Sequence, residues 1–228
     1  MQQEYRKIWG RKQNRPLKEY QKNLLETLLP QLQISLKPET KVDPTIIFPL
    51  SKEDYHLEIG FGGGEHLAAR ALQAPEIGFI GCEPFVNGVA SLVKHIDAHT
   101  IENVCIVIDD ARLLLAALPD QCVSRIYILF PDPWHKKRHN KRRIISSETI
   151  SDLSRVLKSG GSLYLATDII DYADWMQKTL KPRGEFTLEM NGKDTLTDRP
   201  TDWPSPTKYE QKGTKAGRNS SYMIYRKK

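Results

Sequence analysis

Short apolar segments alternate with segments of helical length along this chain, and this alternation constrains the fold more than any other feature. The predicted strands are 55–61, 77–83, 104–109, 123–130 and 160–168. The predicted helices are 65–73, 85–98, 111–118, 145–157 and 172–180. Strands and helices in this order form βαβ units and a parallel sheet. Because the strand segments are almost wholly apolar, we expect helices on both faces of the sheet.

The start of the chain does not follow this alternation. Residues 1–22 have no clean period and are interpreted as a mobile basic arm. Residues 24–32 are predicted to form a short helix that Pro30 stops. We therefore divide the chain into a basic arm with a short helix at 1–35 and one large domain at 36–228.

The composition argues against several classes of protein. The 228 residues contain no apolar run long enough to span a membrane, and the first residues lack the apolar core of a secretory signal, so we expect a cytoplasmic protein. Cys82, Cys105 and Cys122 are isolated, which predicts reduced thiols rather than disulfides or a zinc site. His135 and His139 lie among cations without a carboxylate or thiolate partner, so no metal is expected.

The positive charge is concentrated in three segments. Residues 1–22 carry +5, residues 134–143 carry +6 and residues 207–228 carry +6, whereas the net charge of the whole chain is +6. The remainder of the chain is therefore acidic. Positive segments on an acidic body favour a surface that binds a polyanion, although solvated tails would give the same pattern at either end.

The first predicted strand runs into the glycine-rich stretch "LEIGFGGGEH". Gly60, Gly62 and Gly64 are spaced Gly-x-Gly-x-Gly, and Glu65 stands where a dinucleotide fingerprint needs its third glycine. Glu58 and Glu65 on either side of the turn would repel a pyrophosphate. They suit a cationic ligand without phosphate, such as S-adenosylmethionine, and they disfavour a nicotinamide dehydrogenase.

Acidic residues also end the next two predicted strands. Glu83 is placed to accept hydrogen bonds from both ribose hydroxyls, and Asp110, next to Asp109, to accept from an adenine amino group. Carboxyl ends of parallel strands meet at one edge of the sheet, so these acids and Glu58 are expected around the glycine turn. A purely structural turn with surface acids is the alternative interpretation.

With these features, the sequence resembles the class I S-adenosylmethionine-dependent methyltransferases. The resemblance implies a Rossmann-like, doubly wound sheet of seven mostly parallel strands with an antiparallel late strand. Residues 186–190 and 221–226 would supply the last two strands, joined by a long polar connection.

The fourth predicted strand leads into "LFPDPWHKKRHNKRR". Its first half is a loop with two prolines, and its second half carries six basic residues and no acid. Together with "LEIGFGGGEHL", "ATDIIDYADWM" and "TKYEQKG", this stretch resembles the bacterial tRNA (guanine-N7-)-methyltransferase family from about residue 5 to the C-terminus. The resemblance implies methyl transfer from S-adenosylmethionine to N7 of a guanine in tRNA, at position 46 of the variable loop. Another class I RNA methyltransferase and a non-catalytic RNA-binding protein on this scaffold remain alternatives.

The resemblance also implies roles for individual residues. Asp132 would be the catalytic carboxylate and would contact the cofactor bound by Glu58, Gly60, Gly62, Gly64, Glu83 and Asp110. The substrate would be bound by Lys136, Asp168, Thr207, Lys208, Tyr209 and Glu210. The tRNA backbone would be bound by Arg138, Lys141, Arg142 and Arg143. Two alternatives stay open: Asp168 could cap the following helix, and Trp134 could stack on a base or on the cofactor, or simply pack. Monomer and homodimer are both compatible with the sequence.

Overall fold

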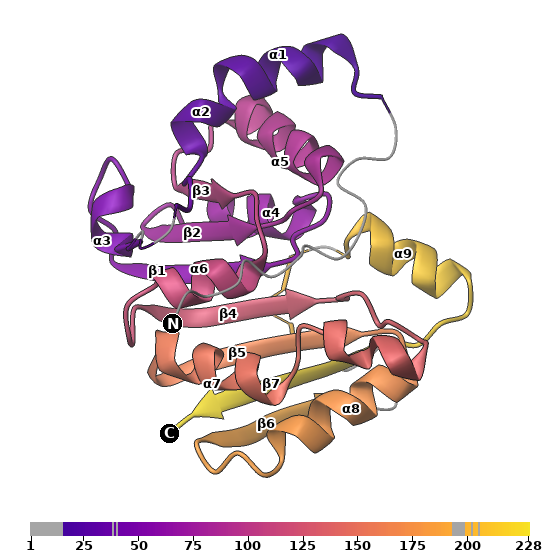
Figure 1. Ribbon diagram of the computed structural model, residues 1–228. Helices are drawn as coiled ribbons and strands as arrows, with labels where there is room; N and C mark the ends of the chain where they lie inside the picture. Colours follow the sequence, from indigo (N-terminus) through magenta and orange to yellow (C-terminus); the bar gives the residue numbers. More distant parts are fainter. Residues whose placement is uncertain (1–15, 38, 40, 193–198, 202, 205) are drawn as a thin grey trace.

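A seven-stranded sheet forms the centre of the computed structural model, which describes residues 16–37, 39, 41–192, 199–201, 203, 204 and 206–228 (Figure 1). The strands are β1 (Asp54–Ile59), β2 (Ile77–Cys82), β3 (Val104–Val107), β4 (Val123–Leu129), β5 (Leu157–Thr167), β6 (Phe186–Gly192) and β7 (Ser221–Lys227). Their order is β3-β2-β1-β4-β5-β7-β6. Strands β1 to β5 pair in parallel, and β7 is antiparallel to both of its neighbours. The predicted mostly parallel sheet with an antiparallel late strand is confirmed.

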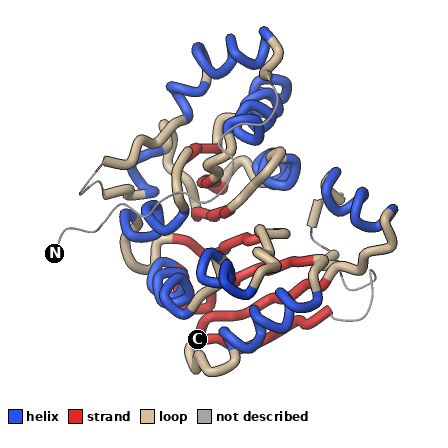
Figure 2. Tube along the Cα trace, turned by 45° about the vertical axis from the view of Figure 1, so that its right-hand side comes forward, coloured by secondary structure: helices blue, strands red, loops and turns tan. Residues whose placement is uncertain are grey.

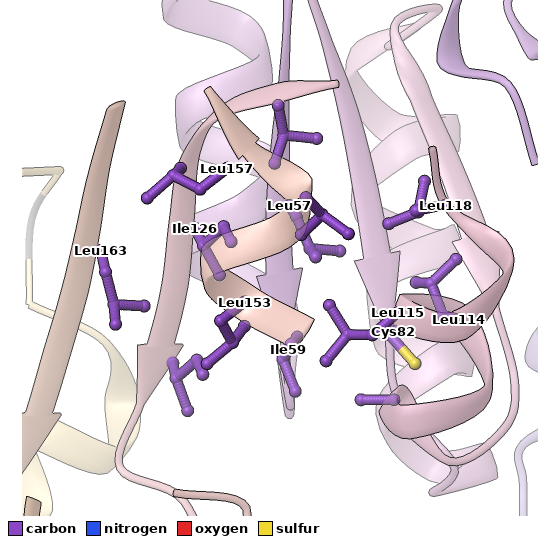
Figure 3. Packing of buried hydrophobic residues seen from close by; sticks show 14 of the residues in the cluster. Leu57, Ile59, Cys82, Leu114, Leu115, Leu118, Ile126, Leu153, Leu157 and Leu163 are labelled. Carbon is purple, nitrogen blue, oxygen red and sulfur yellow. The ribbon is translucent and has the colours of Figure 1, made fainter. Parts of the chain in front are cut away.

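Helices cover both faces of this sheet (Figure 2). Helices α4 (Glu65–Gln73) and α5 (Val86–His99) share one apolar cluster with β2 and β3. Helices α6 (Ala111–Ala117), α7 (Ser147–Val156) and α8 (Ile170–Leu180) share another with β1, β4 and β5. Figure 3 shows Leu114 of α6 and Leu153 of α7 together with Leu57 and Ile126 of the strands, all members of this second cluster. Strands β1, β2 and β3 are mostly apolar because side chains on both of their faces are buried.

The N-terminal region differs from the prediction. Helix α1 (Glu19–Thr27) already begins within the segment interpreted as an arm, and it packs against α5. Pro30 does not stop a helix. It lies at the start of the short helix α2 (Leu29–Leu32), where an N–H group would have no helical acceptor. A further short helix, α3 (Pro44–Ile47), precedes β1. Residues 1–15 of the predicted arm lie outside the described part of the chain.

The polar connection between β6 and β7 contains helix α9 (Lys208–Lys215), which was not predicted. Thr207 and Glu210 form a capping box at its N-terminus, and the Thr-x-x-Glu spacing could have revealed the helix. In Figure 1, α9 lies beyond the carboxyl ends of β4 and β5. Below it, an aromatic cluster covers the sheet face that α4 and α5 leave open; it contains Tyr127, Tyr164, Trp203 and Tyr222.

Candidate active site

A glycine turn joins β1 to α4. The φ angles of Gly60, Gly62 and Gly64 are +75°, +53° and +77°, in the left-handed region that favours glycine. A Cβ atom on Gly64 would lie 2.6 Å from Cβ of Leu92, and one on Gly88 would lie 2.3 Å from the carbonyl oxygen of Gly62. The turn therefore requires glycine for its backbone angles and for its close contact with α5.

Carboxylates from three strand ends gather around this turn. Glu83 is buried, and its two oxygens accept hydrogen bonds from the backbone N–H groups of Gly62, at 2.9 Å, and Phe85, at 3.0 Å. Burial raises the pKa of Glu83 above its ordinary value, the two hydrogen bonds oppose this shift, and the nearby carboxylates of Asp132 and Glu58 add to it. The predicted acids of β1 and of the loop after β4 therefore lie close enough to Glu83 of β2 for their charges to raise its pKa.

Glu58 has a partner that the sequence analysis missed. Nδ1 of His66 lies 2.7 Å from a carboxylate oxygen of Glu58, and each side chain is only 4% exposed. The imidazole packs edge-on against Tyr127 and Trp203, with ring centroids 5.0 and 5.7 Å away. His66 lies on the first turn of the helix that follows the glycine turn. From the sequence, only this position could have indicated that His66 is close to Glu58. The pair fixes the orientation of the Glu58 carboxylate.

Asp110 has a structural role in addition to its predicted one. It is buried at the N-cap of α6, where it accepts hydrogen bonds from the backbone N–H of Arg112 and from its guanidinium at 3.1 Å. The preceding Asp109 is less buried and accepts the backbone N–H of Asp110. The contact of Asp110 with adenine stays a prediction.

The loop after β4 holds its residues in uncommon backbone angles. Phe130 and Trp134 have φ angles of +52° and +47°, although neither is glycine. Each such residue costs about 1 kcal/mol or more and is retained only where its surroundings hold it. The Phe130 N–H donates to the carbonyl of Ala166 at 2.7 Å, and Trp134 packs 4.9 Å from the guanidinium of Arg142. Asp132 is exposed between these two fixed points.

The basic segment after this loop forms a 3-10 helix, η1 (Lys137–Arg142). Lys136, Arg138 and Lys141 are exposed, as phosphate contacts require. The prediction for Arg143 is wrong, because its side chain is only 1% exposed and cannot meet a phosphate in this conformation. It points inward, where it contacts the carbonyl of Pro133, the carboxylate of Asp171 and two aromatic rings of α8.

Asp168 lies at the carboxyl end of β5, and its side chain is 4% exposed. It accepts a hydrogen bond from the hydroxyl of Tyr209 at 3.2 Å and pairs with the guanidinium of Arg218 at 2.9 Å. The alternative interpretation of Asp168 as a helix cap is wrong. Ile169 is the N-cap residue of α8, and it makes no side-chain cap.

Glu210 is buried, and both of its carboxylate oxygens have protein donors. One oxygen accepts the backbone N–H of Thr207, and the other accepts from the guanidinium of Arg199 and the hydroxyl of Tyr222. These contacts stabilise the start of α9 and argue against the predicted contact of Glu210 with guanine. Lys208 is exposed and lies 3.6 Å from Glu65, which brings the α9 motif beside the glycine turn.

Comparisons with known proteins agree with this arrangement. The family model described as "Putative methyltransferase" matches residues 52–223. A tRNA (guanine-N(7)-)-methyltransferase of Paramagnetospirillum magneticum is 43% identical over 97% of this chain and 93% of its own length. One of Caulobacter vibrioides is 45% identical over 90% of this chain and 88% of its own length. This chain belongs to the tRNA (guanine-N(7)-)-methyltransferase family.

The fold of this family member also resembles solved structures of other methyltransferases. The precorrin-6y C5,15-methyltransferase of Geobacter metallireducens aligns with a TM-score of 0.52 at 18% identity, covering 79% of this chain and 84% of that one. At that identity the likeness concerns the fold alone, and it confirms the Rossmann-like class I methyltransferase architecture. In the described ranges, no helix has the length and apolarity to cross a membrane, and His, Cys, Asp and Glu side chains form no cluster of three that could hold a metal ion.

Proposed function

We propose that this protein transfers the methyl group of S-adenosylmethionine to N7 of a guanine in tRNA, at position 46 of the variable loop. One observation carries the proposal: Glu58 and Asp132 lie close enough to Glu83, which binds the glycine turn, to raise its pKa, and the exposed cations of η1 follow Asp132 within a few residues. A pocket for a cationic cofactor thus adjoins a surface for a polyanion. The tRNA substrate would place this reaction in the cytoplasm.

The residues around the glycine turn fit S-adenosylmethionine. Burial and, to a smaller extent, the neighbouring carboxylates raise the pKa of Glu83 and so disfavour its charged form, and a cofactor with phosphates would add further repulsion. A sulfonium and an ammonium group relieve that repulsion instead. Glu83 would accept hydrogen bonds from the ribose hydroxyls, Glu58 would attract the ammonium group, and Asp110 would bind the adenine amino group. Gly60, Gly62 and Gly64 would let the backbone approach the cofactor closely.

The chemistry requires alignment more than proton transfer. Guanine N7 has an in-plane lone pair and no proton, so it can attack the methyl group directly while the S–CH3 bond breaks. S-adenosylmethionine supplies the methyl group, and positive charge develops on the purine. Orientation of the reactants can contribute on the order of 7–11 kcal/mol at best. The Asp132 carboxylate, held between Phe130 and Trp134, would favour the developing charge.

Substrate recognition would combine phosphate contacts with one carboxylate. Lys136, Arg138, Lys141 and Arg142 would bind the tRNA backbone, which positions the substrate without reading its sequence. For the guanine N1–H and 2-amino groups we propose Asp168. Its present partners are partly exposed, Tyr209 to 46% and the side chain of Arg218 to 41%, and they would move aside when guanine binds. Thr207 and Lys208 would complete this side of the pocket.

The decisive experiment maps the methylated nucleoside. The full-length protein is incubated with an unmodified tRNA transcript and S-adenosylmethionine labelled in its methyl group, and the tRNA is then digested to nucleosides. We expect label in 7-methylguanosine, lost when the variable-loop guanine is replaced by adenine. Label in another nucleoside would identify a different RNA methyltransferase. Binding of tRNA without any transfer would identify a non-catalytic RNA-binding protein.

A further inference from the structure

Arg143 departs from the pattern of its own segment. It ends the run of six cations from Lys136, yet its side chain is 1% exposed, whereas Lys136, Arg138 and Lys141 are exposed. A buried guanidinium must satisfy its donors within the protein. The sequence between Lys136 and Arg143 contains no acid, so the partner of Arg143 comes from another element of the fold.

The contacts of Arg143 converge on the loop that carries Asp132. Its Nε donates to the carbonyl oxygen of Pro133 at 2.8 Å, and its Nη2 donates to the carboxylate of Asp171 at 2.7 Å. The guanidinium lies 4.7 Å from the ring centre of Tyr172 and 5.0 Å from that of Trp175, both on α8. Arg143 therefore connects Pro133, the residue after Asp132, to helix α8.

This tie adds to the contacts that Phe130 and Trp134 make on either side of Asp132. Pro131 and Pro133 have no N–H group to donate, and the flanking Phe130 and Trp134 are in left-handed conformations that need external support. The carbonyl of Pro133 is adjacent to Asp132 along the backbone. A shift of that carbonyl would also move the Asp132 carboxylate.

We propose that Arg143 is a positioning residue, which holds Asp132 in its catalytic place through Pro133 and makes no contact with tRNA phosphates. The inference rests on the proposed function, because it assigns Asp132 to methyl transfer. Arg112 extends the arrangement, since its guanidinium donates to the carbonyl of Arg143 at 3.2 Å and pairs with Asp110 at 3.1 Å. The loop at the reactive strand end is thus linked to the proposed adenine site as well.

Lysine should not replace Arg143. The planar guanidinium lies against two aromatic rings while it donates in two directions, to a carbonyl and to a carboxylate. An ammonium group keeps the charge but lacks the planar shape and the fixed angle between the two donors. Arg143→Lys therefore removes the geometry and keeps the charge. A phosphate contact would tolerate this change better than the tie to Pro133 and Asp171 would.

The test compares Arg143→Lys with variants at two other arginines. Steady-state methylation of tRNA gives kcat and KM, and filter binding at several salt concentrations gives the salt slope of the tRNA dissociation constant. For Arg143→Lys we expect kcat to fall on the order of 10- to 100-fold, as for a misplaced catalytic group, with unchanged tRNA affinity and salt slope. For Arg138→Gln we expect weaker tRNA binding and a flatter salt slope.

Arg155→Lys is the matched control. Arg155 also binds backbone carbonyls and an exposed acid, Leu118 and Asp120, but it lies on α7 away from the proposed pocket. We expect its kcat to stay within about twofold of wild type. Asp171→Asn is a second variant of the tie; Asp171 is 78% exposed, so folding should persist and kcat should fall in the same direction. A normal kcat in Arg143→Lys would overturn the proposal, because lysine keeps the charge that a phosphate contact needs and loses only the geometry of the guanidinium.

A readout without turnover separates this inference from the proposed function. Hydrogen exchange of the peptide spanning residues 129–136 should be faster in Arg143→Lys than in wild type and unchanged in Arg155→Lys. If wild type methylates no tRNA, the proposed function fails, whereas faster exchange would still support the anchoring of the loop. Unchanged exchange together with unchanged kcat would refute the role of Arg143.

Discussion

Glu83 offers the sharpest test of the proposed cofactor site. Replacing Glu83 by alanine removes the carboxylate that would accept both ribose hydroxyls. A pair of charge-assisted hydrogen bonds contributes about 1.5–3 kcal/mol, which corresponds to a roughly 10- to 150-fold increase in the dissociation constant of S-adenosylmethionine. Isothermal titration calorimetry of wild type and Glu83→Ala measures this ratio directly.

The same substitution also affects the folded state, and the two effects can be separated. Glu83 accepts the N–H groups of Gly62 and Phe85. Gly62 is exposed and Phe85 is half-buried, so water can reach at least the first of these groups. The expected loss of stability is therefore about 1 kcal/mol, toward the lower end for an unpaired donor. For a chain of this size that corresponds to a decrease in Tm on the order of 2–4 °C.

Glu76→Ala is the control for this experiment, because Glu76 is an exposed acid near the opposite end of β2. Its cofactor affinity should equal that of wild type. The pKa of Glu83 is raised by burial, so in wild type the cofactor affinity should decrease, as pH falls, at a higher pH than for an ordinary glutamate. Unchanged affinity in Glu83→Ala would remove Glu83 from the cofactor site.

Three further perturbations address the loop after β4, the proposed RNA surface and the sheet. Asp132→Ala should reduce kcat far more than it weakens binding of S-adenosylmethionine or tRNA, and near-normal single-turnover rates would make Asp132 structural. Neutralising Arg138 and Lys141 together should lower the salt slope of tRNA binding by about 1.4–1.8 and leave the methylated position unchanged; equal slopes would exclude both contacts. Burial, with the charge of Arg125, lowers the pKa of His56 to about 3, so it stays neutral in the native state. Below the ordinary value near 6.5 the unfolded state binds the additional proton, and wild type should lose about 2 kcal/mol of stability at pH 5 that His56→Gln does not lose in urea titrations.

The strands could be predicted because the sheet is covered on both faces. Every position of β3 is buried, as is every position of β1 after its first residue, so β3 appears in the sequence as an unbroken apolar segment and β1 as an apolar segment interrupted only by His56 and Glu58. Helix α9 was missed for the opposite reason. Its eight residues include three lysines and a glycine, and only the capping box at Thr207 and Glu210 indicates a helix. The four residues from Thr207 to Glu210 were instead interpreted as a motif that binds the substrate.

The acids at the strand ends were predictable for a topological reason, whereas their partners were not. Glu58 and Glu83 follow from the rule that parallel strands end at one edge. The contact of Glu58 with His66 depends on how the first turn of α4 rotates toward the sheet. Of the donors to Glu210, only Thr207 follows from a local spacing, that of the capping box, whereas no spacing in the sequence indicates Arg199 or Tyr222, which are eleven and twelve positions away.

Arg142 and Arg143 show where sequence reasoning reaches its limit. The two residues are adjacent and identical in type, and both were assigned to the tRNA backbone. One guanidinium stacks on Trp134 beside the proposed RNA surface, and the other lies between the rings of Tyr172 and Trp175. At the end of a 3-10 helix the backbone leaves the regular turn, so consecutive side chains point in different directions. Charge density alone therefore predicts that a segment binds a polyanion, but the fold decides which of its cations reach the ligand and which hold the loop beside it.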